Sequence, residues 1–122
     1  MANIVVLDDS ESARALVQRV LGARGHRVVP CDSPFKIISL LASERPDLVL
    51  IDVDMPALTG DRVVQAIRRY ELDHCAIVFY SARPENELQL LVAKTGAAGF
   101  IPKDIGGSEL GRRVEAWLPV SA

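Results

Sequence analysis

Apolar residues follow two alternating patterns along the chain. Short runs rich in Val, Ile and Leu, without polar alternation, are typical of parallel strands buried on both faces. The runs that predict strands are 3–7, 27–31, 47–52, 76–80 and 99–101. Between them, apolar residues recur at intervals of three and four, which predicts helices. Residues with this spacing are Leu16, Val20, Ile37, Leu41, Val63, Ile67, Leu88 and Val92.

Cap and breaker residues predict where the helices begin and end. Ser10 or Asp9 is placed to cap the first helix, and Gly22 and Gly25 are placed to end it. The last helix is expected to turn an apolar stripe inward, and a proline closes it. The stripe and the proline are Leu110, Val114, Trp117, Leu118 and Pro119.

Five strands that alternate with five helices predict an α/β fold with a doubly wound, five-stranded parallel sheet. Pro30 lies in the second strand and cannot donate to a strand ladder, so this strand is expected at an edge. That placement fits the flavodoxin-like (βα)5 order 2-1-3-4-5. A length of 122 residues suits one domain, and we expect it to span residues 1–122.

Composition narrows the functional classes. Hydrophobic residues make up 49% of the chain and charged residues 25%, as in globular proteins, and the formal net charge is −2 with no basic stripe. We therefore expect no direct contact with nucleic acid. No apolar run could span a bilayer and no secretory signal is present, so a cytoplasmic location is expected. Cys31 and Cys75 are expected to be reduced, and His26 and His74 to be solvated.

Polar residues follow four of the predicted strands. In sheets of this kind, ligands bind outside the carboxyl ends of the strands, where the strand order reverses. The polar residues at those ends are Asp8, Asp9, Asp52, Ser81 and Lys103.

The acidic residues among these need a counter-charge. Two carboxylates about 4 Å apart repel by roughly 4 kcal/mol at an effective dielectric constant near 20. Either one acid takes up a proton with a raised pKa, or a cation binds, and an all-oxygen ligand set favours Mg²⁺. Ser81 and Lys103 could then bind the oxygens of a phosphoryl group that the Asp52 carboxylate attacks.

These residues lie in segments that resemble the receiver domain of two-component response regulators (the CheY-like superfamily), in the same order along the whole chain. The segments are Asp8-Asp9, Leu48 to Pro56 with Gly60, Ser81-Ala82 and Gly96 to Lys103. The resemblance implies a phosphoacceptor rather than an enzyme. It also implies a phosphohistidine on a sensor histidine kinase or phosphotransfer protein as the donor.

The resemblance assigns a role to each site residue. Asp52 would be the phosphoacceptor, and Ser81 and Lys103 would hold the phosphoryl oxygens. Ser81 and Phe100 would form the switch. The groups that would surround Mg²⁺ are the side chains of Asp8, Asp9 and Asp52 and the backbone carbonyl of Asp54.

Two residues depart from the family pattern. Asp104 follows Lys103, where the family usually has a proline joined by a cis bond, and Phe100 lacks the hydroxyl of the tyrosine often found there. The geometry of the loop and the coupling of the switch therefore stay open.

Output is expected through a protein partner at the face made by the fourth helix, fifth strand and fifth helix, from a monomer or a phosphorylation-dependent dimer. Two alternatives remain. A pseudo-receiver would keep the fold and bind partners without being phosphorylated. Residues 51–54 also resemble the first motif of haloacid-dehalogenase phosphatases. In that family, however, the motif opens the first strand, and this reading would leave Asp8 and Asp9 unexplained.

Overall fold

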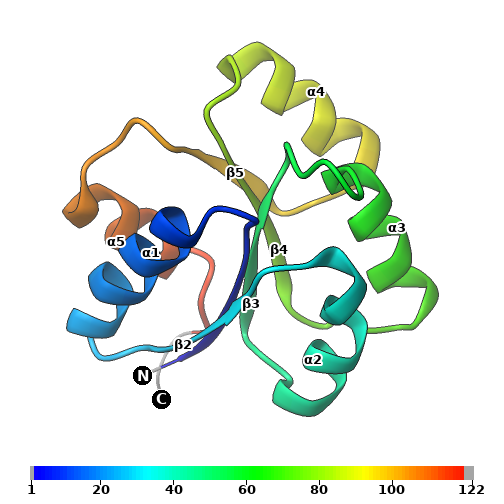
Figure 1. Cartoon of the computed structure of the whole chain (residues 1–122). Coiled ribbons are helices and arrows are strands. Elements are labelled where there is room, and N and C mark those ends of the chain that lie inside the picture. Colours follow the sequence, from blue (N-terminus) through cyan, green and yellow to red (C-terminus); the bar gives the residue numbers. More distant parts are fainter. Residues whose placement is uncertain (1, 120–122) are drawn as a thin grey trace.

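The computed structural model describes residues 2–119, which form one α/β unit (Figure 1). The elements in chain order are β1 (Asn3–Leu7), α1 (Glu11–Ala23), β2 (Arg27–Cys31), the 3₁₀ helix η1 (Pro34–Lys36), α2 (Ile37–Glu44), β3 (Leu48–Asp52), α3 (Gly60–Arg69), β4 (Ala76–Ser81), α4 (Glu85–Thr95), β5 (Gly99–Pro102) and α5 (Gly107–Glu115).

The five strands form one parallel sheet in the order β2-β1-β3-β4-β5. This order confirms the predicted flavodoxin-like arrangement. β2 lies at an edge, as Pro30 indicated. The Arg27 N–H donates to Ala2 O, and the Asp8 N–H donates to Cys31 O. The backbone N–H and C=O groups of the odd-numbered residues of β2 therefore point toward β1, and those of the even-numbered residues point away from it. The nitrogen of Pro30 therefore faces the open edge of the sheet, where the missing N–H removes no hydrogen bond between strands.

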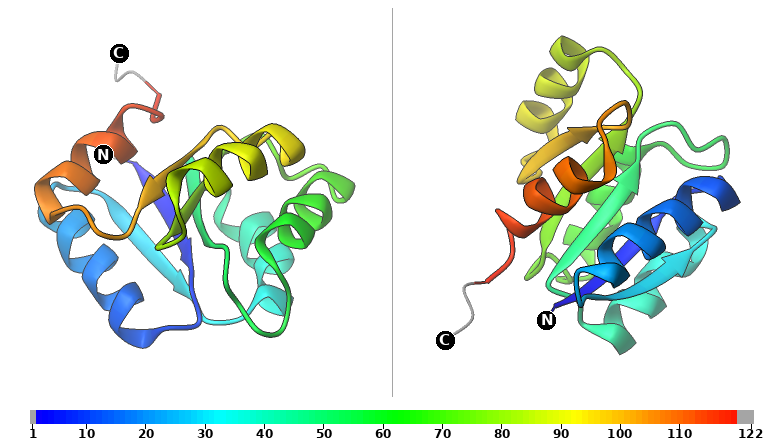
Figure 2. Two further views of the ribbon diagram at one scale, coloured as in Figure 1. Left: turned by 90° about the horizontal axis from the view of Figure 1, so that it is seen from above. Right: turned by 90° about the vertical axis from the view of Figure 1, so that its left-hand side faces the viewer.

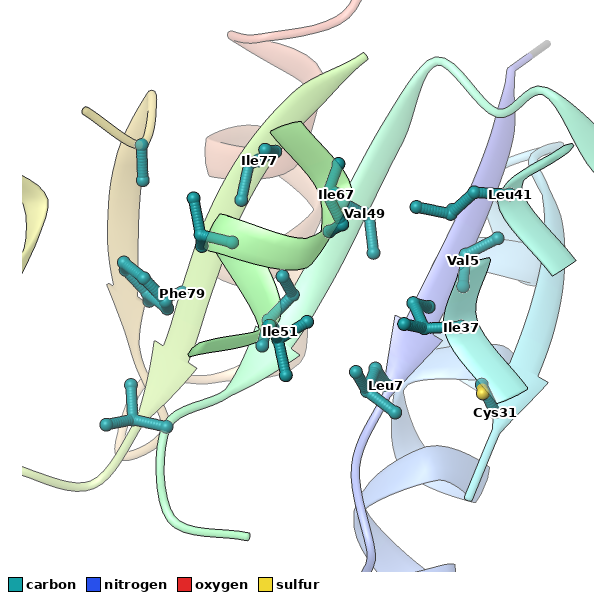
Figure 3. Packing of buried hydrophobic residues seen from close by; sticks show 14 of the residues in the cluster. Val5, Leu7, Cys31, Ile37, Leu41, Val49, Ile51, Ile67, Ile77 and Phe79 are labelled. Carbon is teal, nitrogen blue, oxygen red and sulfur yellow. The ribbon is translucent and has the colours of Figure 1, made fainter. Parts of the chain in front are cut away.

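Helices cover both faces of the sheet, as Figures 1 and 2 show. α1 and α5 pack on one face and bury residues such as Val17 and Leu110 against β1, β3 and β4. α2, α3 and α4 pack on the other face. Figure 3 shows Ile37, Leu41 and Ile67 from α2 and α3 beside apolar side chains of the strands. Burial on both faces explains why β3 shows no polar alternation.

The ends of two helices differ from the prediction. Gly22 lies inside α1, and Gly25, with φ of 92°, makes the left-handed turn after the helix. α5 ends at Glu115, so Trp117 and Leu118 lie beyond the helix. Both still pack against the apolar cluster under α1 and α5, so the predicted stripe was right about burial and wrong about helical extent.

His26 was expected to be solvated, and this expectation was wrong. Its side chain is only 9% exposed, with Nε2 at 2.8 Å from Glu115 Oε2. The Ala2 N–H donates to its Nδ1 at 3.2 Å. Local sequence gave no sign of these partners, because Glu115 is far away along the chain. His74 is exposed, as predicted.

Both cysteines are free and buried. Within residues 2–119, every helix is too short or too polar to cross a membrane.

Candidate functional site

The carboxyl ends of four strands bring the candidate residues together. Asp8 follows β1, Asp52 and Ser81 are the last residues of β3 and β4, and Lys103 follows β5. Leu7 pairs with Ile51 in the sheet, so Asp8 and Asp52 leave neighbouring strands at the same level. The parallel order of the strands thus gathers at one edge side chains that are up to 95 residues apart in sequence.

Three carboxylates form the centre of this edge. Asp8, Asp9 and Asp52 can each place one oxygen within 4.8 Å of the others. Asp8 is 1% exposed and Asp52 6%, whereas Asp9 is exposed to solvent. The Asp52 carboxylate is therefore buried among charges yet retains an opening to solvent.

Local turns hold three of the side chains in place. Asp8 Oδ1 accepts the Ser10 N–H at 2.9 Å, and Asp52 Oδ1 accepts the Asp54 N–H at 3.1 Å. Ser81 Oγ likewise accepts the N–H two residues ahead, from Arg83, at 3.0 Å. β1, β3 and β4 therefore end in the same kind of side-chain turn, which keeps the oxygen atoms at the edge of the sheet.

The Lys103 ammonium lies between two of the carboxylates. Its Nζ is 2.8 Å from Asp8 Oδ2 and 3.6 Å from Asp52 Oδ1. It also lies 5.3 Å from the centre of the Tyr80 ring, a cation–π distance. The Lys103 backbone N–H donates to Ser81 O at 2.9 Å, which fixes the start of the loop. Among residues 2–119 every peptide bond is trans, including the one before Asp104.

Burial and charge shift the titration of this cluster. Burial raises the pKa of the Asp52 carboxyl to about 6, and the negative charge of Asp8 adds to the rise. Burial opposes the charge on Lys103, but the hydrogen bond to Asp8 and the nearby carboxylates outweigh it and raise the pKa of Lys103. The Asp52 carboxyl is thus harder to ionise than an ordinary aspartate, whereas Lys103 holds its proton more tightly than an ordinary lysine.

The carboxylate cluster fits a hard divalent cation. Every candidate ligand is an oxygen atom, three of them can converge, and the one ammonium group of Lys103 faces these three carboxylates. Mg²⁺ is held by such carboxylate sets together with water and phosphate oxygens. Asp54 is adjacent, and its carboxylate is occupied by Arg83, whose Nε lies 2.8 Å from Asp54 Oδ1.

Arg83 and Tyr80 are site residues that the sequence reasoning missed. The Arg83–Asp54 ion pair joins the loops after β3 and β4 at the rim of the site, with both side chains about half exposed. Tyr80 is buried beneath Lys103. The sequence offered one signal for Arg83, namely its position two residues after the end of a strand. That position indicates that Arg83 lies near the site, but not that it pairs with Asp54.

Phe100 lies in β5 opposite Phe79 of β4. Its ring is partly buried and packs against the cluster under α2, α3 and α4. The structure thus places Phe100 on the same face as α4.

Comparisons with known proteins agree with this geometry. The sequence model of the response regulator receiver domain matches residues 4–115. The transcriptional regulatory protein AfsQ1 of Streptomyces coelicolor is 30% identical over 97% of this chain and 52% of its own length. The response regulator MprA of Mycolicibacterium vanbaalenii is 32% identical over 94% of this chain and 49% of its own length. The chain therefore spans about half the length of these relatives.

Solved structures with the same fold include chemotaxis protein CheY4 of Vibrio cholerae, which is 25% identical. Its TM-score is 0.89, over 97% of this chain and 99% of that chain. The signal receiver domain of NarL from Mycobacterium tuberculosis is 32% identical with a TM-score of 0.84, over 94% of each chain.

Proposed function

The chain belongs to the response regulator receiver domain family of two-component systems, and from that premise we propose that Asp52 accepts a phosphoryl group from a phosphohistidine. The observation that carries the proposal is the convergence of three carboxylates, a hydroxyl and an ammonium group at one edge of the sheet. The donor would be a sensor histidine kinase or a phosphotransfer protein, in the cytoplasm, where such phosphoryl donors act.

In the proposed step, an Asp52 carboxylate oxygen attacks the phosphorus atom. A phosphorus–oxygen bond forms, the phosphorus–nitrogen bond breaks, and the imidazole nitrogen keeps the electron pair. Lys103 Nζ lies 3.6 Å from Asp52 Oδ1. The ammonium group can therefore exchange its contact with Asp8 for one with a negatively charged phosphoryl oxygen. Ser81 Oγ already accepts one hydrogen bond, so its own hydrogen is free to be donated to another phosphoryl oxygen.

A bound Mg²⁺ would neutralise charge that develops on the phosphoryl oxygens. Asp8, Asp9 and Asp52 are the side chains that would hold it, and the backbone carbonyl of Asp54 is the proposed fourth protein ligand. The pKa of Asp52 suits this role, because its carboxyl loses a proton near pH 6 and is then available to the metal and to the donor.

The signal would leave through α4, β5 and α5. Ser81 ends β4 and Phe100 lies in the adjacent β5, so movement of Ser81 toward a phosphoryl group would act on the strand that carries Phe100. A downstream protein would read this face, with the chain as a monomer or a phosphorylation-dependent dimer. Phe100 would move by packing alone, since its ring carries no hydroxyl.

Phosphorylation of Asp52 can be tested by intact mass after incubation with acetyl phosphate and Mg²⁺. We expect one stoichiometric phosphoryl adduct on the native chain and none on Asp52→Asn, an isosteric change without a nucleophilic oxygen anion. An adduct that persists in Asp52→Asn would exclude Asp52 as the acceptor. A native chain without an adduct would favour the pseudo-receiver, and steady turnover of a phosphate ester would favour a phosphatase.

The metal assignment can be tested by calorimetric titration with Mg²⁺. Removal of one ligand in Asp9→Ala should weaken Mg²⁺ binding roughly tenfold or more, because fewer carboxylates remain to replace the waters of the ion. Glu11→Ala is the matched control, since Glu11 is exposed at the start of α1 and lies outside the cluster. Equal affinities of Asp9→Ala and Glu11→Ala would contradict the assignment.

A further inference from the structure

A groove of about 700 Å³ runs along the open edge of β2, between α1 and α2. Its lining includes Arg14 from α1, Pro30 and Cys31 from β2, and Lys36, Ser39 and Leu40 from η1 and α2. The hollow beside Ser81, by comparison, is about 360 Å³. A volume of 700 Å³ lies within the range of small-molecule sites, and no step of the proposed phosphoryl transfer uses this groove.

The groove is lined by two cations, Arg14 and Lys36, and by one carboxylate, Asp32, so one positive charge is in excess. Lys36 Nζ lies 3.0 Å from Asp32 Oδ1, so these two groups neutralise each other. Within residues 2–119, Arg14 has no carboxylate within ion-pair distance. Its Nη1 donates to Asp8 O at 2.7 Å, and the other guanidinium N–H groups stay available. An anion is therefore the complementary group, and a carboxylate or sulfonate matches the guanidinium fork.

The rest of the lining favours a ligand whose remaining part, beside the anionic group, is apolar. Pro30, Cys31 and Leu40 present carbon and sulfur atoms, and Ser39 Oγ already donates to Lys36 O. An added β-strand is a poor occupant. Pro30 faces the open edge of β2 and offers no N–H to a further strand, which is a known protection of sheet edges.

We propose that this groove binds a small amphipathic organic anion. Arg14 holds the acidic group of that ligand, and a flat apolar body covers Pro30 and Leu40. None of the three carboxylates of the acidic cluster lines this groove.

Arg14 also connects the groove to the acidic cluster. The same guanidinium lines the groove and donates to the backbone carbonyl of Asp8. A ligand that draws Arg14 outward weakens that contact and changes how Asp8 is held. Coupling between the groove and Mg²⁺ follows, and this second part rests on the proposed function. Linkage requires the effect to be reciprocal.

The groove can be tested with 8-anilinonaphthalene-1-sulfonate, titrated by fluorescence in the presence of EDTA. We expect saturable binding of one probe per chain to the native protein. Ser39→Phe places a phenyl ring in part of the groove and should weaken binding. Ala42→Phe should retain it, because Ala42 is exposed on the same helix outside the groove. Binding that is absent from the native chain, or equal in Ser39→Phe, would overturn the proposal.

A neutral probe tests the role of the ligand's negative charge without a substitution in the protein. N-phenyl-1-naphthylamine has the same aromatic body and no sulfonate, so it should bind the native chain roughly tenfold more weakly, as expected for loss of a charged hydrogen bond. Equal affinity of the two probes would show that Arg14 does not bind the acidic group of the ligand.

The coupling is measured by repeating the sulfonate titration at saturating Mg²⁺. We expect the dissociation constant to change about fivefold, at the low end of known couplings. An unchanged constant would refute the link to Asp8. If calorimetry shows that Mg²⁺ does not bind at all, the proposed function fails, and the titration in EDTA still decides whether the groove binds anions.

Discussion

Within residues 2–119, Asp52 combines burial, a neighbouring acid and one nearby ammonium group, that of Lys103, and this combination has a cost in stability. Burial raises the pKa of its carboxyl from 3.8 to about 6 in the folded chain. The folded state therefore binds a proton more tightly than the unfolded state does between these two values. The free energy of unfolding must then fall as the pH rises through this window.

The stability cost predicts a pH dependence without Mg²⁺. Between pH 4 and pH 7, the Asp52 carboxyl should lower the free energy of unfolding by roughly 2–3 kcal/mol, at about 1.4 kcal/mol per pKa unit. The loss should be complete just above pH 6. Urea unfolding followed by Trp117 fluorescence at several pH values measures it, with the difference between the native chain and Asp52→Asn isolating the carboxyl.

Mg²⁺ supplies the control for this pH effect. Added above pH 6, it should restore the lost stability in the native chain much more than in Asp52→Asn, because a cation that binds only the folded state stabilises it. If native and Asp52→Asn chains lose the same stability between pH 4 and pH 7, the raised pKa is not the cause.

At the scale of elements, β5 and the segment after α5 meet in one close contact. The indole ring of Trp117 lies against Gly99, so closely that a Cβ on Gly99 would overlap the ring. Gly99 is buried at the start of β5, directly before Phe100. A glycine is therefore required there by space rather than by backbone conformation, and the contact joins the segment after α5 to the strand that carries Phe100.

This contact predicts the effect of Gly99→Ala. The added methyl group must displace the indole ring, and overpacking of this kind costs about 1–3 kcal/mol. Urea unfolding should show the loss, together with a shifted emission maximum of Trp117. Gly22→Ala is the matched control. It meets open space within α1 and should be neutral or stabilising, by up to about 1 kcal/mol. Equal stability of both variants would rule out the overlap.

Over the whole molecule, polar contacts also bind together elements that are remote in sequence. Glu115 at the end of α5 accepts Arg24 Nη2 at 2.6 Å and lies 2.8 Å from His26 Nε2. The hydrogen bonds from Arg24 and His26 lower the pKa of Glu115 to about 2. This group therefore stabilises the fold fully above pH 4.5, and the contribution is lost as the pH falls toward 2.

Glu115→Gln should accordingly lower the free energy of unfolding at pH 7. We expect about 1 kcal/mol or less, because the side chain is one third exposed and solvent screens the pairs. The difference from the native chain should disappear near pH 2. Glu109→Gln breaks only pairs within α5 and should have a smaller effect. A loss at pH 7 that persists unchanged at pH 2 would show that charge is not responsible.

The sequence by itself determined the strands, the order of the elements and the polar residues at the strand ends. Burial on both faces leaves a continuous apolar run in β3, and Pro30 marks an open edge, so local patterns report these features directly. The candidate residues Asp8, Asp52 and Lys103 were found in this way. Strand ends are close in space whenever the sheet is parallel, whatever the details of packing.

Only the tertiary structure decided which side chains pair across the molecule. His26 with Glu115, Arg83 with Asp54 and Arg14 over the β2 groove each depend on contacts between different elements. The early end of α5 was also settled there. Trp117 is partly buried although it lies outside the helix, because its contact with Gly99 of β5 depends on where the ring lies and not on a helical backbone. The spacing of apolar residues indicates whether a residue is buried. Which side chain it contacts depends on how the elements pack in the folded chain.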